Sequence, residues 1–582
     1  MISRTRQWLE ERRSAFSRTP FGCLVGLFLN RLFRGAADAE AGELDLGVAV
    51  ILVLLVMPGL LVSLLTLEKY GSLMRFLHGQ GAFDPFSATI SDEYLFIVLS
   101  ASVTAAAALW RWDAIFLDRR DYTNLVPLPL SLRTLFSANL CAILSFAAIL
   151  TIVANGASMV LFPIAVVGSQ PSLSLFLRFA AGHAAAVLSA SVFSFFFIFA
   201  LAGLLTALLP SAAFRKLSLS IRFVSVIALL ALLATSFTVP DLLKRLSVTS
   251  AHGIAILPPI SFLGIARTVW GNANDPFSAA MTGAALIAIG LAALTAMVAY
   301  IFSFRRSFLR LPELADAGPI RRLSRCFSPL TFFHNLAPRS SSPRACCQFV
   351  ARSLLRSTAH LQTLLCSLAV GLVVSAESLS SASLHFSVES NTSPPMEFLS
   401  IPFILSYCLL AGIRFAFEIP LDLRANWIFR LWLDPDRHDS RSVARRVLLV
   451  FSLFCLGPLT FLCTLEFWGW TTALLHTTVW CACTVVLTEI LLIRFRKMPF
   501  TCPYPSFQSH SPLIVVAYLF GFYIFKSWLP PLDQWALLHP INAVWFIPLL
   551  GSILAGLHWY RQQMLDMDKR ITFEDVSTTT FS

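Results

Sequence analysis

The chain has 582 residues, of which 57% are hydrophobic and only 13% are charged, and its mean hydropathy is +0.73. Soluble domains average about 45–50% apolar and about 25% charged residues, so this composition excludes an ordinary soluble enzyme, a disordered chain and a disulfide scaffold. The net charge of +12 comes from Lys and Arg that lie between apolar runs. The sequence therefore predicts an all-α polytopic membrane protein.

The segment before the first apolar stretch, residues 1–45, is basic and is predicted to be cytosolic. Five of its apolar side chains share one face of a helix: Phe21, Leu24, Leu27, Phe28 and Leu32. Asn30 and Arg31 fall elsewhere on that helix. This pattern is typical of an amphipathic helix that lies in the membrane interface. A loosely ordered basic tail is the alternative interpretation.

Twelve apolar stretches are long enough to cross a bilayer, which takes about 20 helical residues. The first transmembrane half, 46–304, contains six of them: 46–67, 94–112, 140–167, 180–209, 223–239 and 279–304. A basic cytosolic linker, 305–356, follows. The second transmembrane half, 357–559, contains the other six: 357–376, 396–413, 447–465, 470–493, 512–529 and 541–559. Residues 560–582 are predicted to form a cytosolic tail.

The distribution of positive charge predicts the orientation of these spans. If the N-terminus is cytoplasmic and the spans alternate, 37 of the 44 Lys and Arg residues lie on the cytoplasmic side. Cytoplasmic loops favour Lys and Arg, and the bias holds for every loop except the one between the fifth and sixth spans. The sequence therefore predicts twelve spans, with the N-terminus and the C-terminus both inside.

The two halves share features at corresponding places. Each has its largest structured cytosolic loop after its second span, at 113–139 and at 414–446. Each also has a pair of prolines in the outside loop between its fifth and sixth spans, at 258–259 and at 530–531. We interpret the chain as a degenerate tandem repeat of a six-span unit.

The loop after the second span combines a charged cluster with a short apolar segment. This segment is Asn-Leu-Val-Pro-Leu-Pro-Leu, 124–130, and it follows four charged residues: Asp118, Arg119, Arg120 and Asp121. Ser131 can cap the helix that leads into the third span. A short apolar helix is unfavourable in water by itself, so we expect 125–130 to dock on a partner or on its own protein. A plain turn packed on the span ends is the alternative.

The order of residues in this loop resembles the loop between the second and third spans of type-2 ATP-binding-cassette exporter permeases. In that family the loop carries the coupling helix that contacts the ATPase subunit. The matching residues are Asn124, Leu125, Pro127, Leu128, Pro129, Ser131, Arg133 and Leu135. The N-terminal amphipathic helix is similar to the family's connecting helix, and 257–264 lies where the family has re-entrant helices.

The resemblance implies the membrane-spanning subunit of an exporter in the bacterial cytoplasmic (inner) membrane. One chain would supply both of the six-span halves that the family usually brings together as a dimer. The implied partners are a separate ATP-binding-cassette ATPase subunit and membrane lipid; no nucleic acid is expected, and participation of a second copy of the chain is left open. The corresponding loop of the second half lacks the Leu-Pro-Leu-Pro signature, and its candidate coupling residues are Arg424, Asn426, Trp427 and Arg430.

The sequence lacks the motifs of an ATPase or a hydrolase. It contains no G-x-x-x-x-G-K-[ST], so another chain would have to bind the ATP. H-E-x-x-H and Gly-x-Ser-x-Gly are absent as well. We therefore expect a transport permease that is not an enzyme and has no catalytic residue, metal site or cofactor of its own.

Few ionisable residues fall within the spans, where such residues are functional candidates by default. His183 and His476 are expected at the interface, near the outer ends of their spans, and Glu489 is expected to pair with Arg494 at the inner rim. Lys526 is the fourth. An ion-coupled carrier needs such groups near the midplane, so their scarcity favours a permease whose energy arrives from outside the bilayer.

Two other functions compete with the exporter. A twelve-span ion-coupled secondary transporter of the major-facilitator kind is favoured by Asp118-Arg119, although the glycines of that family's loop are absent. A membrane-embedded lipid or glycan transferase would need a clustered acidic or His site. The candidate cluster is Asp434, Asp436, His438 and Asp439, which a solvated, proline-containing loop explains better.

Overall fold

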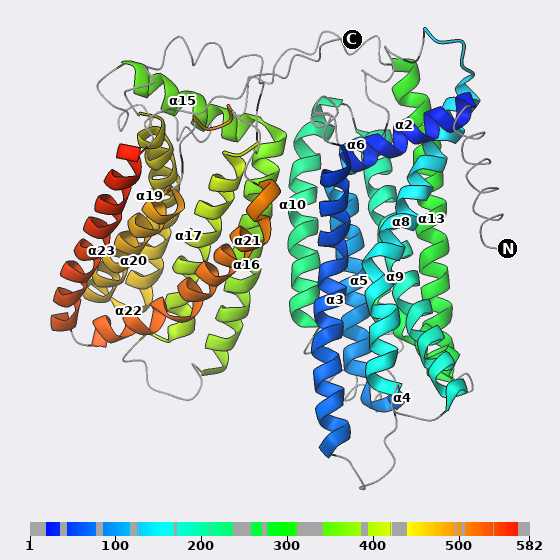
Figure 1. The fold of residues 1–582 in the computed structure, drawn as a ribbon, viewed down its shortest axis with the longest axis horizontal. Helices are drawn as coiled ribbons and strands as arrows, with labels where there is room; N and C mark the ends of the chain where they lie inside the picture. Colours follow the sequence, from blue (N-terminus) through cyan, green and yellow to red (C-terminus); the bar gives the residue numbers. More distant parts are fainter. Residues whose placement is uncertain are drawn as a thin grey trace. The chain divides into compact units, whose positions relative to one another are not determined.

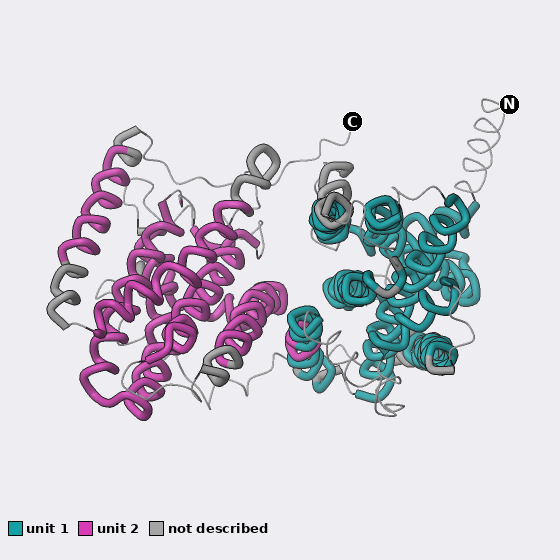
Figure 2. The backbone as a smooth tube through the Cα atoms, turned by 90° about the horizontal axis from the view of Figure 1, so that it is seen from below, with its two compact units in different colours: residues 1–222, 228–318 teal, residues 223–227, 319–582 magenta. Residues whose placement is uncertain are grey.

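The structure is a computed structural model that describes residues 19–34, 44–76, 85–116, 125, 127–167, 172–209, 211–236, 258–270, 276–310, 341–385, 394–419, 421, 439–493, 495, 498–501, 507–538 and 540–567. Every regular element in these residues is a helix, which confirms the predicted all-α class. The chain divides into two compact units (Figure 2): unit 1 is 1–222 with 228–318, and unit 2 is 223–227 with 319–582.

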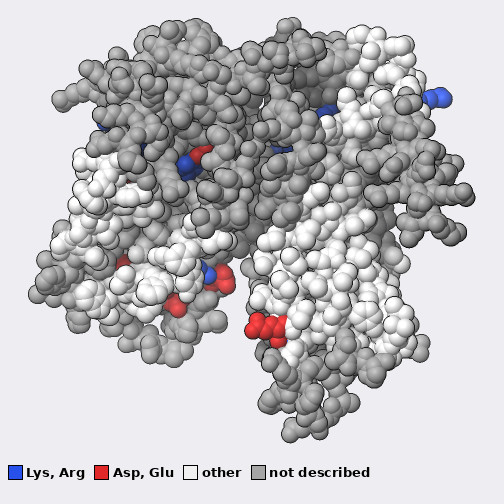
Figure 3. Space-filling view, in the orientation of Figure 1, with Lys and Arg blue, Asp and Glu red and all other residues white. Residues whose placement is uncertain are grey.

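Nine helices in the described part of the chain are long and apolar enough to cross a membrane: Ile90–Trp110, Leu132–Val167, Leu173–Leu208, Leu217–Thr235, Ser278–Phe304, Thr358–Leu379, Met396–Ala416, Arg441–Trp468 and Trp470–Leu491. Their outward faces are apolar; Leu286 and Ile287, for example, are 60% and 64% exposed. Figure 3 shows few charged side chains on the described surface of the visible face. So large an exposed apolar surface is unfavourable in water, and the chain is a helical polytopic membrane protein.

The described residues of unit 1 form one amphipathic helix, six long helices and three short ones, and one of the long helices, α10, contains the residues 223–227 that group with unit 2. In chain order they are α2 (Pro20–Arg34), α3 (Leu44–Phe76), α4 (Pro85–Ala88), α5 (Ile90–Trp110), α6 (Trp112–Ile115), α8 (Leu132–Val167), α9 (Leu173–Leu208), α10 (Ser211–Thr235), α12 (Pro258–Trp270) and α13 (Pro276–Arg310). Each predicted span of the first half overlaps one of the long helices. Several helices extend beyond the predicted span because polar residues continue them past the apolar window.

The predicted N-terminal helix forms, as α2. It crosses the ends of the long helices of unit 1, at the end opposite α4 (Figure 1). Leu24, Phe28 and Leu32 are buried, and the helix packs mainly on α8. Leu27 is 53% exposed, although the predicted apolar face includes it. Burial of one face on the protein therefore fixes α2 to unit 1.

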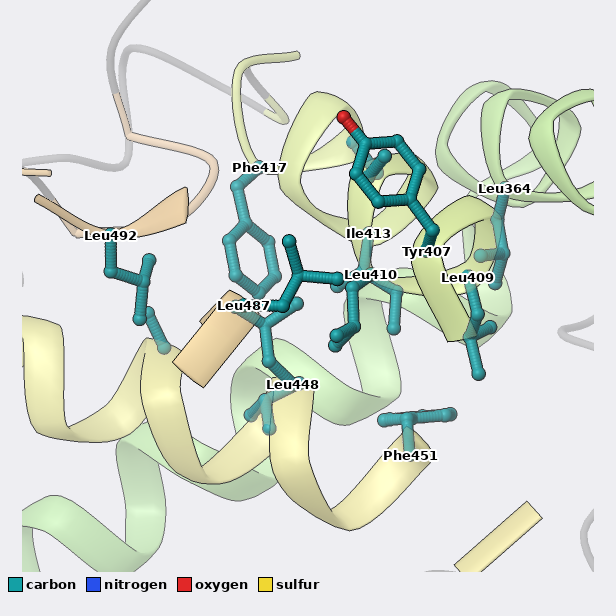
Figure 4. Close-up of a cluster of buried hydrophobic side chains, with 14 of the residues drawn as sticks. Leu364, Tyr407, Leu409, Leu410, Ile413, Phe417, Leu448, Phe451, Leu487 and Leu492 are labelled. Carbon is teal, nitrogen blue, oxygen red and sulfur yellow. The ribbon is translucent and has the colours of Figure 1, made fainter. Parts of the chain in front are cut away.

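Unit 2 repeats much of this order. Its helices are α15 (Ser341–Arg356), α16 (Thr358–His385), α17 (Met396–Ala416), α19 (Asp439–Trp468), α20 (Trp470–Leu491), α21 (Phe507–Ser527), α22 (Leu529–Leu538) and α23 (Pro540–Met567). Each predicted span of the second half overlaps one of the long helices. Their core lies where α17 meets α19 and α20, and Figure 4 shows Leu410, Phe417, Leu448 and Leu487 within it.

The segment 305–356, predicted as a linker, ends in a helix that is not among the predicted elements. In α15 the side chains of Cys347, Val350, Ala351 and Leu354 are at most 3% exposed and belong to the core of unit 2. Their spacing of three, four and seven residues is the period of one helix face. The sequence therefore contains a second amphipathic helix, placed before the first long helix of unit 2 as α2 is placed before that of unit 1.

The two units share packing partners as well as helix order. The amphipathic helix of each unit, α2 or α15, packs on the third long helix, α8 or α19. A short helix follows the fifth long helix, and this helix, α12 or α22, packs against the second, fourth and sixth long helices of its own unit. Each short helix therefore fixes the spacing of three long helices at the end opposite α2 or α15.

Helix α12 comes unusually close to its neighbours at two glycines. A Cβ atom at Gly264 would lie 2.5 Å from Cβ of Met281 and 2.9 Å from the backbone nitrogen of Thr282 on α13. A Cβ atom at Gly182 on α9 would lie 2.3 Å from Nε1 of Trp270. Only glycine permits these approaches without movement, so both positions hold α12 in place.

Candidate functional site

The apolar segment that was predicted to couple to a partner forms an exposed turn at the α2 end of unit 1. Leu125 is buried, at 8% exposed, and anchors the turn, whereas Leu128 is 48% exposed. Pro127 and Pro129 are exposed beside it, and Arg133 is exposed on the first turn of α8. Residues 127–129 therefore present an apolar surface to their surroundings, while the buried Leu125 ties the turn to unit 1 and Val126 lies outside the described residues.

Local hydrogen bonds set the shape of this turn. The N–H of Leu128 donates to the carbonyl oxygen of Leu125 at 3.2 Å, and the N–H of Leu130 donates to that of Leu128 at 2.7 Å. Ser131 then accepts from the N–H of Thr134 at 3.1 Å, which is the cap predicted for α8. The turn is thus continuous with the start of the third long helix.

Backbone-directed arginines connect α2 to the short helix α6, which precedes the turn. Arg31 on α2 donates to the carbonyl oxygens of Ala114, at 2.5 Å, and Phe116, at 3.2 Å. Arg111 donates in return to the carbonyl oxygen of Phe33. Helix termini leave such carbonyls without intrahelical partners, so these bonds satisfy them and fasten α2 to the end of α5 and to α6.

A second contact joins α6 to α10. Arg222 on α10 forms an ion pair with Asp113, and its guanidinium lies 5.4 Å from the ring centroid of Trp112. Trp112 and Ile115 are fully buried. Buried or ion-paired side chains therefore connect α6 to α2, to the end of α5 and to α10.

Nine of the predicted coupling residues lie outside the described residues: Asp118, Arg119, Arg120, Asp121, Asn124, Arg424, Asn426, Trp427 and Arg430. The acidic candidates Asp434 and Asp436 and the candidate His438 lie outside them too. The structure describes the others, Leu125, Pro127, Leu128, Pro129 and Arg133, and brings them together in one turn. Within the part of the chain that is described, no three His, Cys, Asp or Glu side chains form a metal-binding group.

Unit 2 has a groove of about 520 Å³ along the exposed side of α15. Arg352 and Arg356 lie one turn apart on this side, with Gln348 before them and Phe349 beside them. Leu421 closes the groove from the segment after α17, and its N–H donates to the carbonyl oxygen of Phe500 at 3.1 Å. The groove offers positive charge and amide donors next to apolar surface.

His183 and His476 each form a buried pair with a carboxylate, whereas their position at the membrane interface stays a prediction. Nδ1 of His183 lies 2.8 Å from Oε2 of Glu93, and Nδ1 of His476 lies 2.5 Å from Oδ2 of Asp533. The side chains of all four residues are 0% exposed. Glu93 belongs to α5 and Asp533 to α22. Both acids are far from their histidine in the sequence, so the predicted spans alone do not indicate these pairs.

Each pair leaves polar atoms without a partner. Nε2 of His183 and of His476, Oε1 of Glu93 and Oδ1 of Asp533 have no hydrogen bond in the described structure. Burial raises the pKa of the Asp533 carboxyl above its usual range, and the hydrogen bond from His476 opposes that shift. Buried polar atoms normally find partners, so these four mark a functional candidate.

Glu489 forms ion pairs with two arginines that the sequence analysis does not predict. Its carboxylate lies 2.9 Å from Nη2 of Arg441 and 2.6 Å from Nε of Arg445, both on α19. Arg494, the predicted partner, lies outside the described residues. The pair thus joins the third and fourth long helices of unit 2. Its position at a helix–helix contact explains Glu489 as a structural ion pair.

A cluster of uncharged polar side chains lies between α5, α8 and α9. The hydroxyl of Ser191 lies 2.6 Å from that of Ser100 and accepts from Asn155 at 2.8 Å and from Thr104 at 3.0 Å. The Ser and Thr members of this cluster are not among the sequence predictions, because single Ser and Thr residues are common in apolar helices. Interhelical bonds of this kind hold membrane helices together.

No protein-family model, curated protein or solved structure matches the chain significantly.

Two signals in the sequence could have indicated the buried pairs. Asp533 is the one ionisable residue in the ten-residue apolar helix α22, and an isolated acid in such a segment needs a partner. Glu93 lies one residue before the predicted start of the second span, whereas the helix already begins at Ile90. A longer second span would have placed this acid among the intramembrane candidates.

Proposed function

We propose that the chain is the membrane-spanning permease of an ATP-driven exporter, with twelve spans and both termini in the cytoplasm. A separate ATPase subunit would dock on the turn at 125–130 and on the loop after the eighth span. The chain itself would carry out no chemistry. Its two six-helix units would move against each other as the ATPase subunits close, and the resemblance places it in the bacterial cytoplasmic membrane.

The exposed turn at Leu128 carries this proposal. It presents apolar and proline side chains at the end of unit 1 where α2 lies, and its anchor Leu125 is buried. Exposed apolar surface at such a place favours a protein partner. Arg31, Arg111 and Arg222 join α6, which precedes the turn in the chain, to α2, to the end of α5 and to α10. We infer that a partner docked on the turn would move unit 1 as a body.

Two further features support the same function. A short helix follows the fifth long helix in each unit, where the resemblance implies re-entrant helices. Both units also place an amphipathic helix on the third long helix, which is what a repeat of a six-span exporter subunit would contain. The groove is lined by Leu421, which comes shortly before the second set of predicted coupling residues in the sequence, and its two arginines could receive an acidic side chain of a partner.

Site-specific photo-crosslinking tests the docking surface. A photoreactive amino acid at Leu128 is expected to capture an ATPase subunit in native membranes. The matched control is Leu208, which is 74% exposed at the last residue of α9, at the same end of unit 1. Capture of the ATPase from Leu128 but not from Leu208 agrees with the proposal, whereas no capture, or equal capture from both positions, contradicts it.

The buried His–carboxylate pairs favour a second candidate function, a twelve-span ion-coupled secondary transporter. Such carriers use ionisable groups inside the membrane. The structure adds two acids, Glu93 and Asp533, to the candidates that the predicted spans contain, and pairs each with a histidine. The two candidates differ in energy source. Transport in proteoliposomes by the chain alone, driven by a proton gradient without ATP, would establish the secondary transporter.

A further inference from the structure

The two units place the same buried pair in corresponding positions but build it from different helices. In both, the imidazole is on the fourth long helix and a phenyl ring of the second long helix packs edge-on against it: Phe96 on His183, with ring centroids 5.4 Å apart, and Phe403 on His476, at 6.1 Å. The carboxylate comes from the second long helix in unit 1 and from α22 in unit 2. The two units therefore share the histidine–carboxylate pair but not the helix that supplies the carboxylate.

The surroundings of each pair exclude a net charge. All four side chains are inaccessible to solvent, and in the described structure neither pair has a further ion-pair partner. An uncompensated charge in such a place is strongly unfavourable. A pair that holds one proton is neutral as a whole, whether the proton lies on the imidazole or on the carboxyl group. A pair that holds none carries one negative charge.

In the described structure no other ionisable group forms an ion pair with Glu93 or His183. The ionisable groups on the elements packed around this pair are Glu68, Lys69 and Tyr70 on α3, Asp92 and Tyr94 on α5, Arg178 on α9 and Arg267 on α12. Lys69 forms an ion pair with Asp92 at 2.7 Å, and Arg178 donates to the carbonyl oxygen of Trp270. The described part of α4, and the described parts of α8 and α13 at the α4 end of unit 1, carry no ionisable residue.

The unit 2 pair has a similar environment. The described ionisable groups toward the α22 end of the helices, or partway along them, are Glu397, Tyr407 and Cys408 on α17, Cys455, Cys463 and Glu466 on α19, Cys481 and Cys483 on α20, and Tyr518, Tyr523 and Lys526 on α21. On α23 the described ones, His558, Tyr560 and Arg561, lie toward the other end. Helix α22 is held by the pair and by Gln534, which donates to the carbonyl oxygen of Pro394 at 3.0 Å.

We propose that each pair is a buried binding site for a single proton, which the site releases when water reaches it. Release transfers the proton from the pair to water and changes no other bond. In unit 2 the event that admits water is the separation of α22 from α20, and in unit 1 it is the separation of α5 from α9. Either energy source for transport is compatible with this proposal, because it concerns the chain alone.

The proposal fixes the sign and the size of a pH effect. In water a carboxyl group titrates near pH 4 and an imidazole near pH 6.5, so an opened pair holds no proton above about pH 7. The closed pair retains one proton, and opening must release it. The ratio of open to closed forms therefore rises as pH rises above about 6.5, by up to about tenfold per pH unit for each pair. Between about pH 4.5 and 6 it does not change, because both forms hold one proton.

Hydrogen exchange of the purified full-length chain in lipid nanodiscs, without nucleotide, measures this opening. The peptides of interest cover 90–100 in unit 1 and 529–538 in unit 2, and their exchange rates are corrected for the intrinsic effect of pH. Between pH 7 and 8.5 the corrected opening of both is expected to rise about tenfold per pH unit. Glu93→Gln and Asp533→Asn keep the size of the side chain but remove the retained proton.

The two variants control each other. Glu93→Gln is expected to abolish the pH dependence at 90–100 and leave that at 529–538 unchanged, and Asp533→Asn is expected to do the reverse. The unchanged peptide shows that the rest of the variant remains folded. The proposal is overturned if the wild-type peptides show no pH-dependent opening, including no measurable exchange, or if each variant retains the dependence at its own site. A failed search for an ATPase partner would not affect this result.

Discussion

The close approach of α12 to α13 predicts that Gly264→Ala destabilises unit 1. An added Cβ would meet Cβ of Met281 at 2.5 Å, the backbone nitrogen of Thr282 at 2.9 Å and the carbonyl oxygen of Ser278 at 3.0 Å. Two of these three atoms belong to the backbone of α13, so a change of rotamer cannot relieve the contact. The helices themselves must separate.

The magnitude follows from a comparison with a glycine that has space. At Gly283 on α13, an added Cβ would have no heavy atom of another residue within 4 Å beyond its own stretch of helix. Replacing either glycine by alanine stabilises a helix by about 0.5–1 kcal/mol, and that gain cancels in the difference between the two variants. Overpacking costs about 1–3 kcal/mol. Gly264→Ala is therefore expected to unfold more readily than Gly283→Ala by about 1–3 kcal/mol.

Reversible unfolding in mixed detergent micelles measures this difference. The expected gap corresponds to roughly a 5- to 150-fold change in the unfolding equilibrium constant at about 1.4 kcal/mol per tenfold. Equal stability of the two variants would refute the argument that Gly264 is required for the packing of α12 on α13.

Three other predictions concern single side chains. Asp533→Ala leaves its histidine buried without a partner and should cost about 3–5 kcal/mol in unfolding free energy, whereas Asp533→Asn should cost clearly less; similar losses would contradict the pairing. Leu125→Asp buries a charge and should cost several kcal/mol, whereas Leu128→Asp should leave the unfolding free energy unchanged within about 0.5 kcal/mol. Burial raises the pKa of Cys347 to about 11, so its thiolate should be scarce at pH 8 and become common only as pH approaches 11. Alkylation of Cys347 should therefore be slow relative to alkylation of the exposed Cys23. Equal rates at the two cysteines would refute the burial of Cys347.

The sequence predicts the helices better than it predicts their contacts. Apolar length depends only on local composition, and each predicted span overlaps a helix. Contacts between helices depend on residues far apart, so the sequence does not indicate that Glu93 and Asp533 pair with His183 and His476 in the core. Helix α15 is an intermediate case, because the spacing of its apolar residues is visible at Val350 and Leu354, but the basic residues around them favour a linker.

The turn at 125–130 shows the same division. Its prolines and leucines indicate an apolar segment after the second span, and Ser131 indicates the cap of the next helix, which α8 has. The sequence does not show which leucine faces outward, because that depends on how the turn packs on unit 1. The structure buries Leu125 and exposes Leu128, so a test of docking that leaves the fold intact must change Leu128.

The central claim is that a separate ATPase drives this chain, and purification from the native membrane tests it most directly. The tagged chain is isolated in mild detergent, and ATP hydrolysis is measured on the eluate. The proposed function predicts that a soluble ATPase co-purifies, that the eluate hydrolyses ATP, and that Leu128→Asp removes both. A folded chain that purifies alone and without hydrolysis would contradict the claim and favour the ion-coupled transporter.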